Sequence, residues 1–174
     1  DCGPTRLLLK PDPKAFIMRA SGSNFDGTIT VPNAKNSAII GQFNKLYFKK
    51  SKSMLVVTDN TAKKSEEPLK PSEIPAIQIT VDDLRVASLA LGRAEIITSP
   101  TSAGMQIQKL STHSALISTT SSGVWQGVGK QQRVAIKSQI TSSDLGQLLS
   151  SLQYANMINH GEVKADIDLF WSGG

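Results

Sequence analysis

Apolar and polar residues alternate with a period of two along most of the chain. The segment that begins at Ile77 is typical, because Ile77, Ile79 and Val81 alternate with polar residues. Such alternation indicates a β-strand with one apolar and one polar face. Similar segments recur between short turns that contain glycine or proline, which favours an antiparallel meander in which each strand pairs with the one before it. The predicted strands cover residues 6–9, 15–20, 25–31, 37–50, 77–82, 91–98, 105–110, 115–119, 124–128, 133–140 and 162–169.

The strand predicted over residues 37–50 is apolar on both faces. Strict alternation places Ile39, Phe43 and Tyr47 on one face and Ile40, Leu46 and Phe48 on the other. We therefore expect cover on each side of this strand. The pair Asp82-Asp83 is expected to open a turn.

One segment follows a helical period instead. Over residues 143–154 the apolar positions are spaced i, i+3, i+4 and i+7, behind a serine that can cap the first turn. The stripe consists of Leu145, Leu148, Leu149 and Leu152. We expect this one amphipathic helix, near the C-terminus, to cover one end of the sheet or its concave side.

The composition changes in the middle of the chain. Residues 58–75 are mostly Lys, Ser, Asn, Glu and proline, which bury too little apolar surface to offset the entropy of ordering. We predict a flexible linker or long loop there, between N-terminal strands in residues 1–57 and a second β-rich part in residues 76–174. The chain stops on a glycine pair directly after an apparent strand, so we expect a piece of a longer protein.

Composition and charge exclude several classes of protein. The 174 residues are long enough to bury a core, and no stretch approaches the ~20 apolar residues that span a bilayer. The net charge of +5 rests on scattered lysines, with only 5% aromatic residues to stack on bases, which argues against a nucleic-acid partner. The single cysteine, Cys2, excludes an internal disulfide, and its role stays open.

The residues that catalysis needs are not arranged in a recognisable pattern. His113 and His160 are the only histidines, and neither lies near a nucleophile elbow or at metal-ligand spacing. Asp166 and Asp168 form a solvent-facing stripe, although two carboxylates on one face can in principle act as acid and base. We therefore expect a protein that is not an enzyme and that holds no metal or cofactor.

The alternating strands expose more apolar surface than one short helix can cover. Each leucine-sized side chain left in water forgoes about 1.5–3 kcal/mol. A second sheet, a neighbouring repeat of a longer chain, or a lipid could cover this face. The pattern alone does not distinguish these occupants.

Several phrases resemble the AsmA-like family of the YhdP type. Residues 74–85 (IPAIQITVDDLR), followed by LGRAE at 91–95, are similar to a Leu-Pro-Ala-Leu … Asp-Leu-Arg … Leu-Gly segment of that family. Residues 143–149 (SDLGQLL) and 169–173 (LFWSG) resemble a downstream stretch, and residues 25–32 (FDGTITVP) an upstream strand. The chain departs from the family pattern at Gln153, His160 and Ser172, where the family has Gly, Gly and Pro.

The resemblance implies a mainly β fold: a curved antiparallel meander sheet that forms an open groove. Such proteins are long, anchored in the inner membrane of Gram-negative bacteria, and conduct phospholipid through the periplasm to the outer membrane, which supports its permeability barrier. The expected partners are phospholipid acyl chains and neighbouring repeats of the same parent chain, with the anchor outside this fragment. The residues expected to line the groove are Ile77, Ile79, Val81, Val134, Ile136, Ile140, Val163, Ile167 and Leu169, and the leucine stripe of the helix would cover or gate part of it.

Two other functions fit the same pattern. An assembly module could receive a β-strand from an outer-membrane protein by sheet-edge addition. A plain β-sandwich interaction domain would bury the apolar face against a second sheet.

Overall fold

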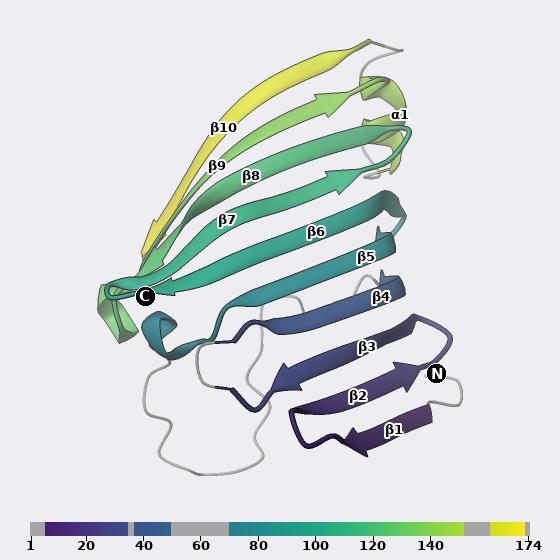
Figure 1. The fold of residues 1–174 in the computed structure, drawn as a ribbon. Coiled ribbons are helices and arrows are strands. Elements are labelled where there is room, and N and C mark those ends of the chain that lie inside the picture. Colours follow the sequence, from purple (N-terminus) through teal and green to yellow (C-terminus); the bar gives the residue numbers. More distant parts are fainter. Residues whose placement is uncertain (1–5, 35–36, 50–69, 152–160, 173–174) are drawn as a thin grey trace.

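A computed structural model describes four parts of the chain, residues 6–34, 37–49, 70–151 and 161–172. All strands in these parts belong to one open ten-stranded sheet that runs in the order β1 to β10 (Figure 1). The strands are β1 (Arg6–Pro11), β2 (Ala15–Ser21), β3 (Phe25–Pro32), β4 (Ile39–Phe48), β5 (Ile77–Val86), β6 (Leu89–Thr101), β7 (Gly104–His113), β8 (Ile117–Gln126), β9 (Arg133–Ser142) and β10 (Val163–Ser172). The predicted mainly β, open meander is therefore confirmed.

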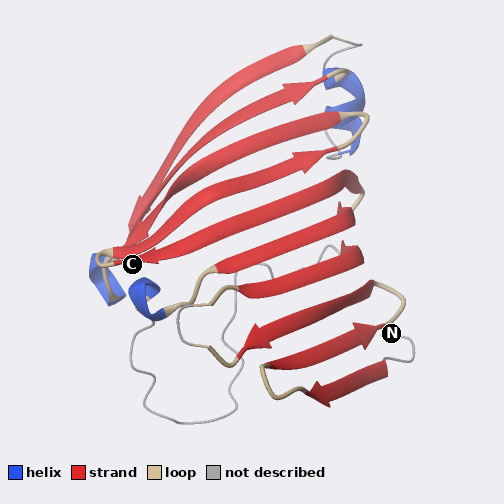
Figure 2. Cartoon of the chain, in the orientation of Figure 1, coloured by secondary structure: helices blue, strands red, loops and turns tan. Residues whose placement is uncertain are grey.

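The helical segments lie at the ends of strands (Figure 2). They are the α-helix α1 (Leu145–Ser151) and the 3-10 helices η1 (Pro71–Glu73) and η2 (Gly129–Gln131). Several predicted features lie outside the described residues: Cys2, most of the linker, the end of the helical stripe at Leu152, and His160.

One neighbouring pair of strands departs from the predicted antiparallel pattern. β4 and β5 are hydrogen-bonded in parallel, with Ile39 opposite Ile77 and Phe48 opposite Val86. Parallel neighbours cannot be joined by a tight hairpin, because the chain has to return to the end of the sheet where the first strand began. The long polar segment between β4 and β5 supplies this return, and strands on either side of it share one sheet.

Two predicted turns are instead parts of strands. The strands predicted at residues 115–119 and 124–128 form the single strand β8, and Gly123 pairs with both Ile107 and Ile136 inside the sheet. A Cβ atom on Gly123 would lie 2.2 Å from the carbonyl oxygen of Ala135, so glycine is needed there for close approach of backbones and not for a turn. Asp82 and Asp83 likewise lie within β5.

Three β-bulges interrupt the strict alternation in the same way. β4, β5 and β7 each contain two polar residues between an apolar residue and a leucine, at residues 43–46, 81–84 and 107–110. In each bulge, the partners of the apolar residue and of the leucine lie two positions apart on the neighbouring strand. The apolar residue and the leucine therefore project to the same side of the sheet. Leu46 therefore shares a face with Phe43, and Tyr47 lies on the opposite face, so the prediction from strict alternation was wrong for this strand.

The helix α1 begins as the leucine pattern predicted, with a different capping residue. The backbone N–H of Gln147 donates to Oδ1 of Asp144 at 2.9 Å, so Asp144 caps the first turn in place of the predicted serine. Ser143 instead donates its hydroxyl to the carbonyl oxygen of Ala115, which ties the helix to the turn before β8. Leu148 is the buried residue of the stripe, and Leu145 and Leu149 are half-buried.

The ring of Phe43 occupies the space above a glycine on the neighbouring strand. A Cβ atom on Gly27 would lie 2.3 Å from Cδ1 of Phe43 and 2.6 Å from the carbonyl oxygen of Gln42. At Gly41 the nearest atom would be Cγ1 of Ile79, at 3.0 Å. The substitution Gly27→Ala is therefore expected to lower the free energy of unfolding by about 1–3 kcal/mol, because ring and backbone must both shift.

Chemical denaturation of Gly27→Ala and Gly41→Ala checks this expectation. The second substitution meets a side chain that can move by a few tenths of an ångström, so its cost should be smaller. Equal stability of Gly27→Ala and the unmodified chain would contradict the packing described for Phe43.

Candidate functional site

The register of the sheet collects apolar side chains on one side, here called the apolar face. Residues directly opposite each other on paired strands project to the same side of a sheet. The middle row crosses all ten strands and consists of Leu9, Met18, Ile29, Gly41, Ile79, Ile96, Leu110, Ser121, Ser138 and Ile167. The first row, one pleat away, consists of Leu7, Ala20, Gly27, Phe43, Val81, Ala94, Thr112, Thr119, Ile140 and Ala165. The third row crosses β4 to β10 and consists of Ile39, Ile77, Thr98, Ile107, Gly123, Ile136 and Leu169. None of these three rows contains a charged residue.

The residues predicted to line a groove all lie on this face. Seven of the nine belong to the three rows, and Val134 and Val163 share the face by alternation with Ile136 and Ala165. Strands that are far apart in the sequence thus contribute to one surface. Contact of these side chains with lipid stays a prediction.

The apolar face is buried in the middle of the sheet and exposed at both edges. Val81 is 3% exposed and Ala94 is 4% exposed, whereas on the edge strands Leu9 is 56% and Leu169 is 47% exposed. The apolar surface therefore continues to the outermost strands on both sides.

The opposite side, here called the polar face, carries the charged residues. Lys109 of β7 forms a salt bridge with Glu95 of β6, and Lys137 of β9 lies opposite Asp168 of β10. The second residue of the bulge in β5, Asp83, also projects to this side. The division of the two faces agrees with an antiparallel sheet that has one apolar and one polar side.

A cluster on the polar face joins β4 and β5 at their parallel seam. The Tyr47 hydroxyl donates to Oδ2 of Asp83 at 2.5 Å, and Arg85 donates to both carboxylate oxygens of Asp83 at 2.9 and 3.1 Å. The guanidinium of Arg85 also lies 4.8 Å from the centre of the Tyr47 ring. The hydrogen bonds from Arg85 and then from Tyr47 lower the pKa of Asp83, and the bond to Asp83 raises the pKa of Tyr47.

Hydroxyl groups on the apolar face are mostly paired with each other. The hydroxyls of Thr112 and Thr119 lie 2.9 Å apart, and those of Ser121 and Ser138 lie 2.8 Å apart. Pairing reduces the cost of placing these groups among apolar side chains. The exception among the described residues is Thr98, whose Oγ1 atom is buried without a partner. An unpaired buried hydroxyl costs about 1–3 kcal/mol.

The elements α1 and η1 lie at opposite ends of the strands (Figure 1). α1 lies beside the ends of β8 and β9, where Ile117 and Ser142 of the apolar face are buried. η1 lies against β6, β7 and β8 near the other strand ends. Its first residue, Pro71, is fully buried. Side chains of the apolar face between α1 and η1, such as Ile96 and Leu110 of the middle row, remain half-buried.

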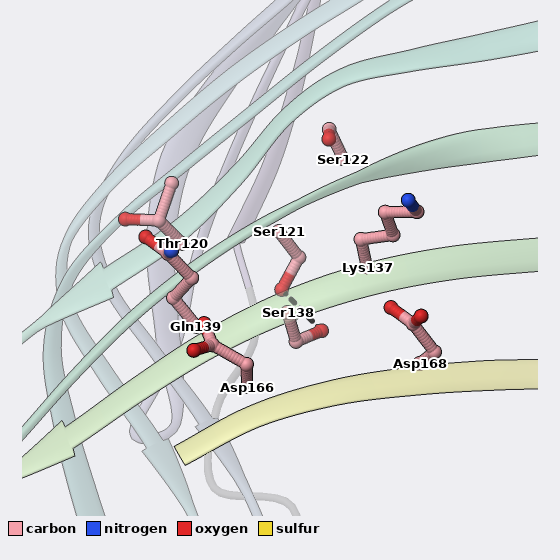
Figure 3. A pocket seen from close by; sticks show the side chains of 8 residues that line it. All are labelled: Thr120, Ser121, Ser122, Lys137, Ser138, Gln139, Asp166 and Asp168. Atoms are coloured by element: carbon pink, nitrogen blue, oxygen red, sulfur yellow. Dashed lines mark hydrogen bonds between the residues drawn. The ribbon is translucent and has the colours of Figure 1, made fainter. Parts of the chain in front are cut away.

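A hollow of about 320 Å³ lies over β8, β9 and β10 (Figure 3), and its charged lining residues belong to the polar face. It is lined by Thr120, Ser121, Ser122, Lys137, Ser138, Gln139, Asp166 and Asp168. Both aspartates are exposed, as predicted for a solvent-facing stripe, and they outnumber the one ammonium group, which disfavours an anionic ligand. No group of three or more metal-ligating side chains occurs in the described residues, and His113 is exposed, with its Nδ1 atom 3.4 Å from the Ser118 hydroxyl.

The family model described as YhdP protein matches residues 3–174. The chain belongs to the YhdP family. No curated protein and no solved structure matches it significantly. Membership in this lipid-transport family implies a protein of the bacterial envelope, and the open sheet fits a β-groove module for lipid transport. Within the described residues, no helix has the length and apolar character needed to cross a membrane.

Several functional features were missed by the sequence reasoning. Strict alternation overlooked the bulges, although their repeated pattern of an apolar residue, two polar residues and a leucine was a signal. The cover formed by η1 and the unpaired hydroxyl of Thr98 have no such signal, because they depend on segments that meet only in the folded chain.

The Asp83 cluster leads to an expected pH dependence of stability. The folded-state pKa of Asp83 lies below its unfolded value of about 3.9, so the cluster stabilises the fold above pH ~4. This contribution is lost as the pH falls through the lowered folded-state pKa. Because the groups are partly exposed, the effect is expected to be small.

Urea unfolding of the unmodified chain and of Asp83→Asn tests this dependence. The substitution should lower the urea midpoint at pH 7, and the difference should shrink at pH 2.5. Asp82→Asn, at the neighbouring exposed position, is the matched control and should change little. A difference between Asp83→Asn and the unmodified chain that does not depend on pH would contradict the role of the carboxylate.

Proposed function

We propose that this chain is a segment of a periplasmic bridge that conducts phospholipids between the inner and outer membranes along its apolar face. The observation that carries the proposal is the continuity of the uncharged rows, two of which cross all ten strands. The family to which the chain belongs supports the same function.

An acyl chain can move along such rows without desolvating a charge. Apolar contact is non-directional and proportional to area, so neighbouring positions along the rows differ little in free energy. At about 4.8 Å between strands, ten strands provide a path of about 43 Å. Because the sheet is open, a polar headgroup can remain in water while the acyl chains follow the rows.

Transport of this kind needs no reacting group in the protein. The proposed partners are phospholipid acyl chains and neighbouring repeats of the same parent chain, in a protein anchored in the inner membrane. The exposed apolar residues on β1 and β10 support a path that continues beyond this segment, since Leu9 ends the middle row on β1 and Leu169 ends the third row on β10.

Strand addition by an outer-membrane protein is the second candidate function. It is favoured by the end of β10, where Phe170 is 73% exposed on the polar face and Trp171 is 52% exposed on the apolar face. An edge strand with apolar residues on both faces is prone to pair with another strand. The sandwich alternative lacks support, because all described strands form one sheet.

Photo-crosslinking from paired positions on the two faces tests lipid binding. A photoreactive amino acid at Ile136 or Ile167 should crosslink to phospholipid in the bacterial envelope. The same amino acid at Lys137 or Asp168, one residue along the same strands, is the matched control and should crosslink far less. Equal yields from both faces would refute the proposed path, and crosslinks from β10 to unfolded outer-membrane protein would favour strand addition.

The substitution Ile136→Asp separates a transport surface from an ordinary core. Ile136 is half-buried in an open sheet, so we expect the fold to persist while the charge blocks lipid transfer by the full-length protein. Circular dichroism and transfer of labelled lipid between vesicles measure the two effects. Lys137→Asp should leave transfer intact. Unfolding of the Ile136→Asp variant would indicate a sealed core.

A further inference from the structure

We infer that η1 is a displaceable cover that competes with lipid for part of the third row. The inference rests on the proposed function and adds a point of control to it. It is carried by the position of η1, by the way η1 is attached, and by the unpaired hydroxyl beneath it.

The position of η1 follows from burial around β6 and β7. Pro71 is fully buried, and η1 lies against β6, β7 and β8. At the same strand ends, Thr98 and Met105 of the apolar face are 7% and 5% exposed. Their neighbours on the polar face, Ser99 and Gln106, remain half-buried. η1 therefore lies on the side of the apolar face, at the strand ends where Thr98 of the third row and Met105 are buried.

The attachment of η1 to the sheet is apolar. Its hydrogen bonds are internal: the N–H of Glu73 donates to the carbonyl oxygen of Lys70 at 3.0 Å, and that of Ile74 donates to the carbonyl oxygen of Pro71 at 3.4 Å. The ion pair between Lys70 and Glu73 is internal too. Within the described residues, no hydrogen bond joins Pro71–Glu73 to β6, β7 or β8.

The helix α1, at the opposite strand ends, is attached by hydrogen bonds. The N–H of Ser143 donates to the carbonyl oxygen of Leu116 at 3.2 Å, and that of Leu145 donates to the carbonyl oxygen of Gly161 at 2.7 Å. α1 is thus joined by hydrogen bonds to the segments before β8 and before β10. The segment after η1 is joined to β4, because the N–H of Ile39 donates to the carbonyl oxygen of Ala76 at 2.8 Å. Within the described residues, however, lifting Pro71–Glu73 itself breaks no hydrogen bond to the sheet, so η1 is the cover that can move.

The unpaired hydroxyl of Thr98 destabilises the state in which η1 covers the third row. With η1 seated, the Oγ1 atom of Thr98 has no hydrogen-bond partner and no access to water. With η1 lifted, this hydroxyl can bond to water or donate to an ester oxygen of a lipid lying on the third row. Burial of Pro71 favours the seated state, and the unpaired hydroxyl opposes it. The two states are therefore balanced in a way that lipid can shift.

The substitution Thr98→Val tests the balance between seated and lifted η1, because valine keeps the shape of threonine and removes the unpaired hydroxyl. The readout is the phospholipid crosslink yield from a photoreactive residue at Ile107, next to Thr98 in the third row, divided by the yield at Ile136, which lies on β9 beyond η1. The probe is vesicles of phosphatidylethanolamine and phosphatidylglycerol. Thr98→Val should lower this ratio about fivefold, because it favours the seated cover.

For two further variants, we expect the crosslink ratio to rise in one and to stay unchanged in the other. Pro71→Gly removes the buried ring and should raise the ratio. Thr112→Val removes a buried hydroxyl that is paired with Thr119, so it should lower stability and leave the ratio unchanged. This matched pair of threonine substitutions separates an effect on the cover from a general effect of losing a hydroxyl.

The outcomes distinguish failure of this inference from failure of the proposed function. If Ile136 still crosslinks to lipid while Thr98→Val leaves the ratio unchanged or raises it, the cover does not compete with lipid and the transport proposal stands. If neither Ile107 nor Ile136 crosslinks to lipid in any variant, the transport proposal itself fails, and this inference fails with it.

Discussion

The structure depends on keeping every strand in phase with its neighbours across a single sheet. A slip of one residue would move a strand's apolar side chains to the polar face and bring polar side chains into the rows. The bulges in β4, β5 and β7 preserve this phase. Each accommodates an additional polar residue without moving the following leucine off the apolar face. Bulges also increase local bending and twist, which suits a curved sheet.

A sheet without a second layer has to be held together by means other than a conventional core. Only a few side chains of the described residues are deeply buried, and they lie on β5 to β8, in the two covers or beneath them. On the polar face, cross-strand charge pairs such as Lys109 with Glu95 add modest stabilisation. The Tyr47, Asp83 and Arg85 cluster lies where it is most useful, because β4 and β5 are joined by a long return of the chain and not by a hairpin.

The two faces suit different tasks for a physical reason. A ligand that moves along a surface must meet no deep minimum and no steep barrier, and a continuous uncharged surface meets both requirements. Mutual pairing of the hydroxyls on β7, β8 and β9 keeps that part of the surface weakly polar. Thr98 departs from this rule at the position that η1 covers, which makes the covered site the least uniform point of the path.

The sequence by itself determined the class of fold, the order of most strands, the helical stripe and the alternation by which the predicted residues of each strand share one side. These properties follow from local periodicity, and periodicity is set by the residues of one strand or one helix. The tertiary structure alone decided the parallel pairing of β4 with β5, the place of Gly123 inside β8, and the face of Tyr47. It also decided which apolar residues are covered, because Pro71 and Thr98 are 27 positions apart in the sequence. Pairing direction and burial depend on contacts between distant segments, and these contacts form only when the whole sheet assembles.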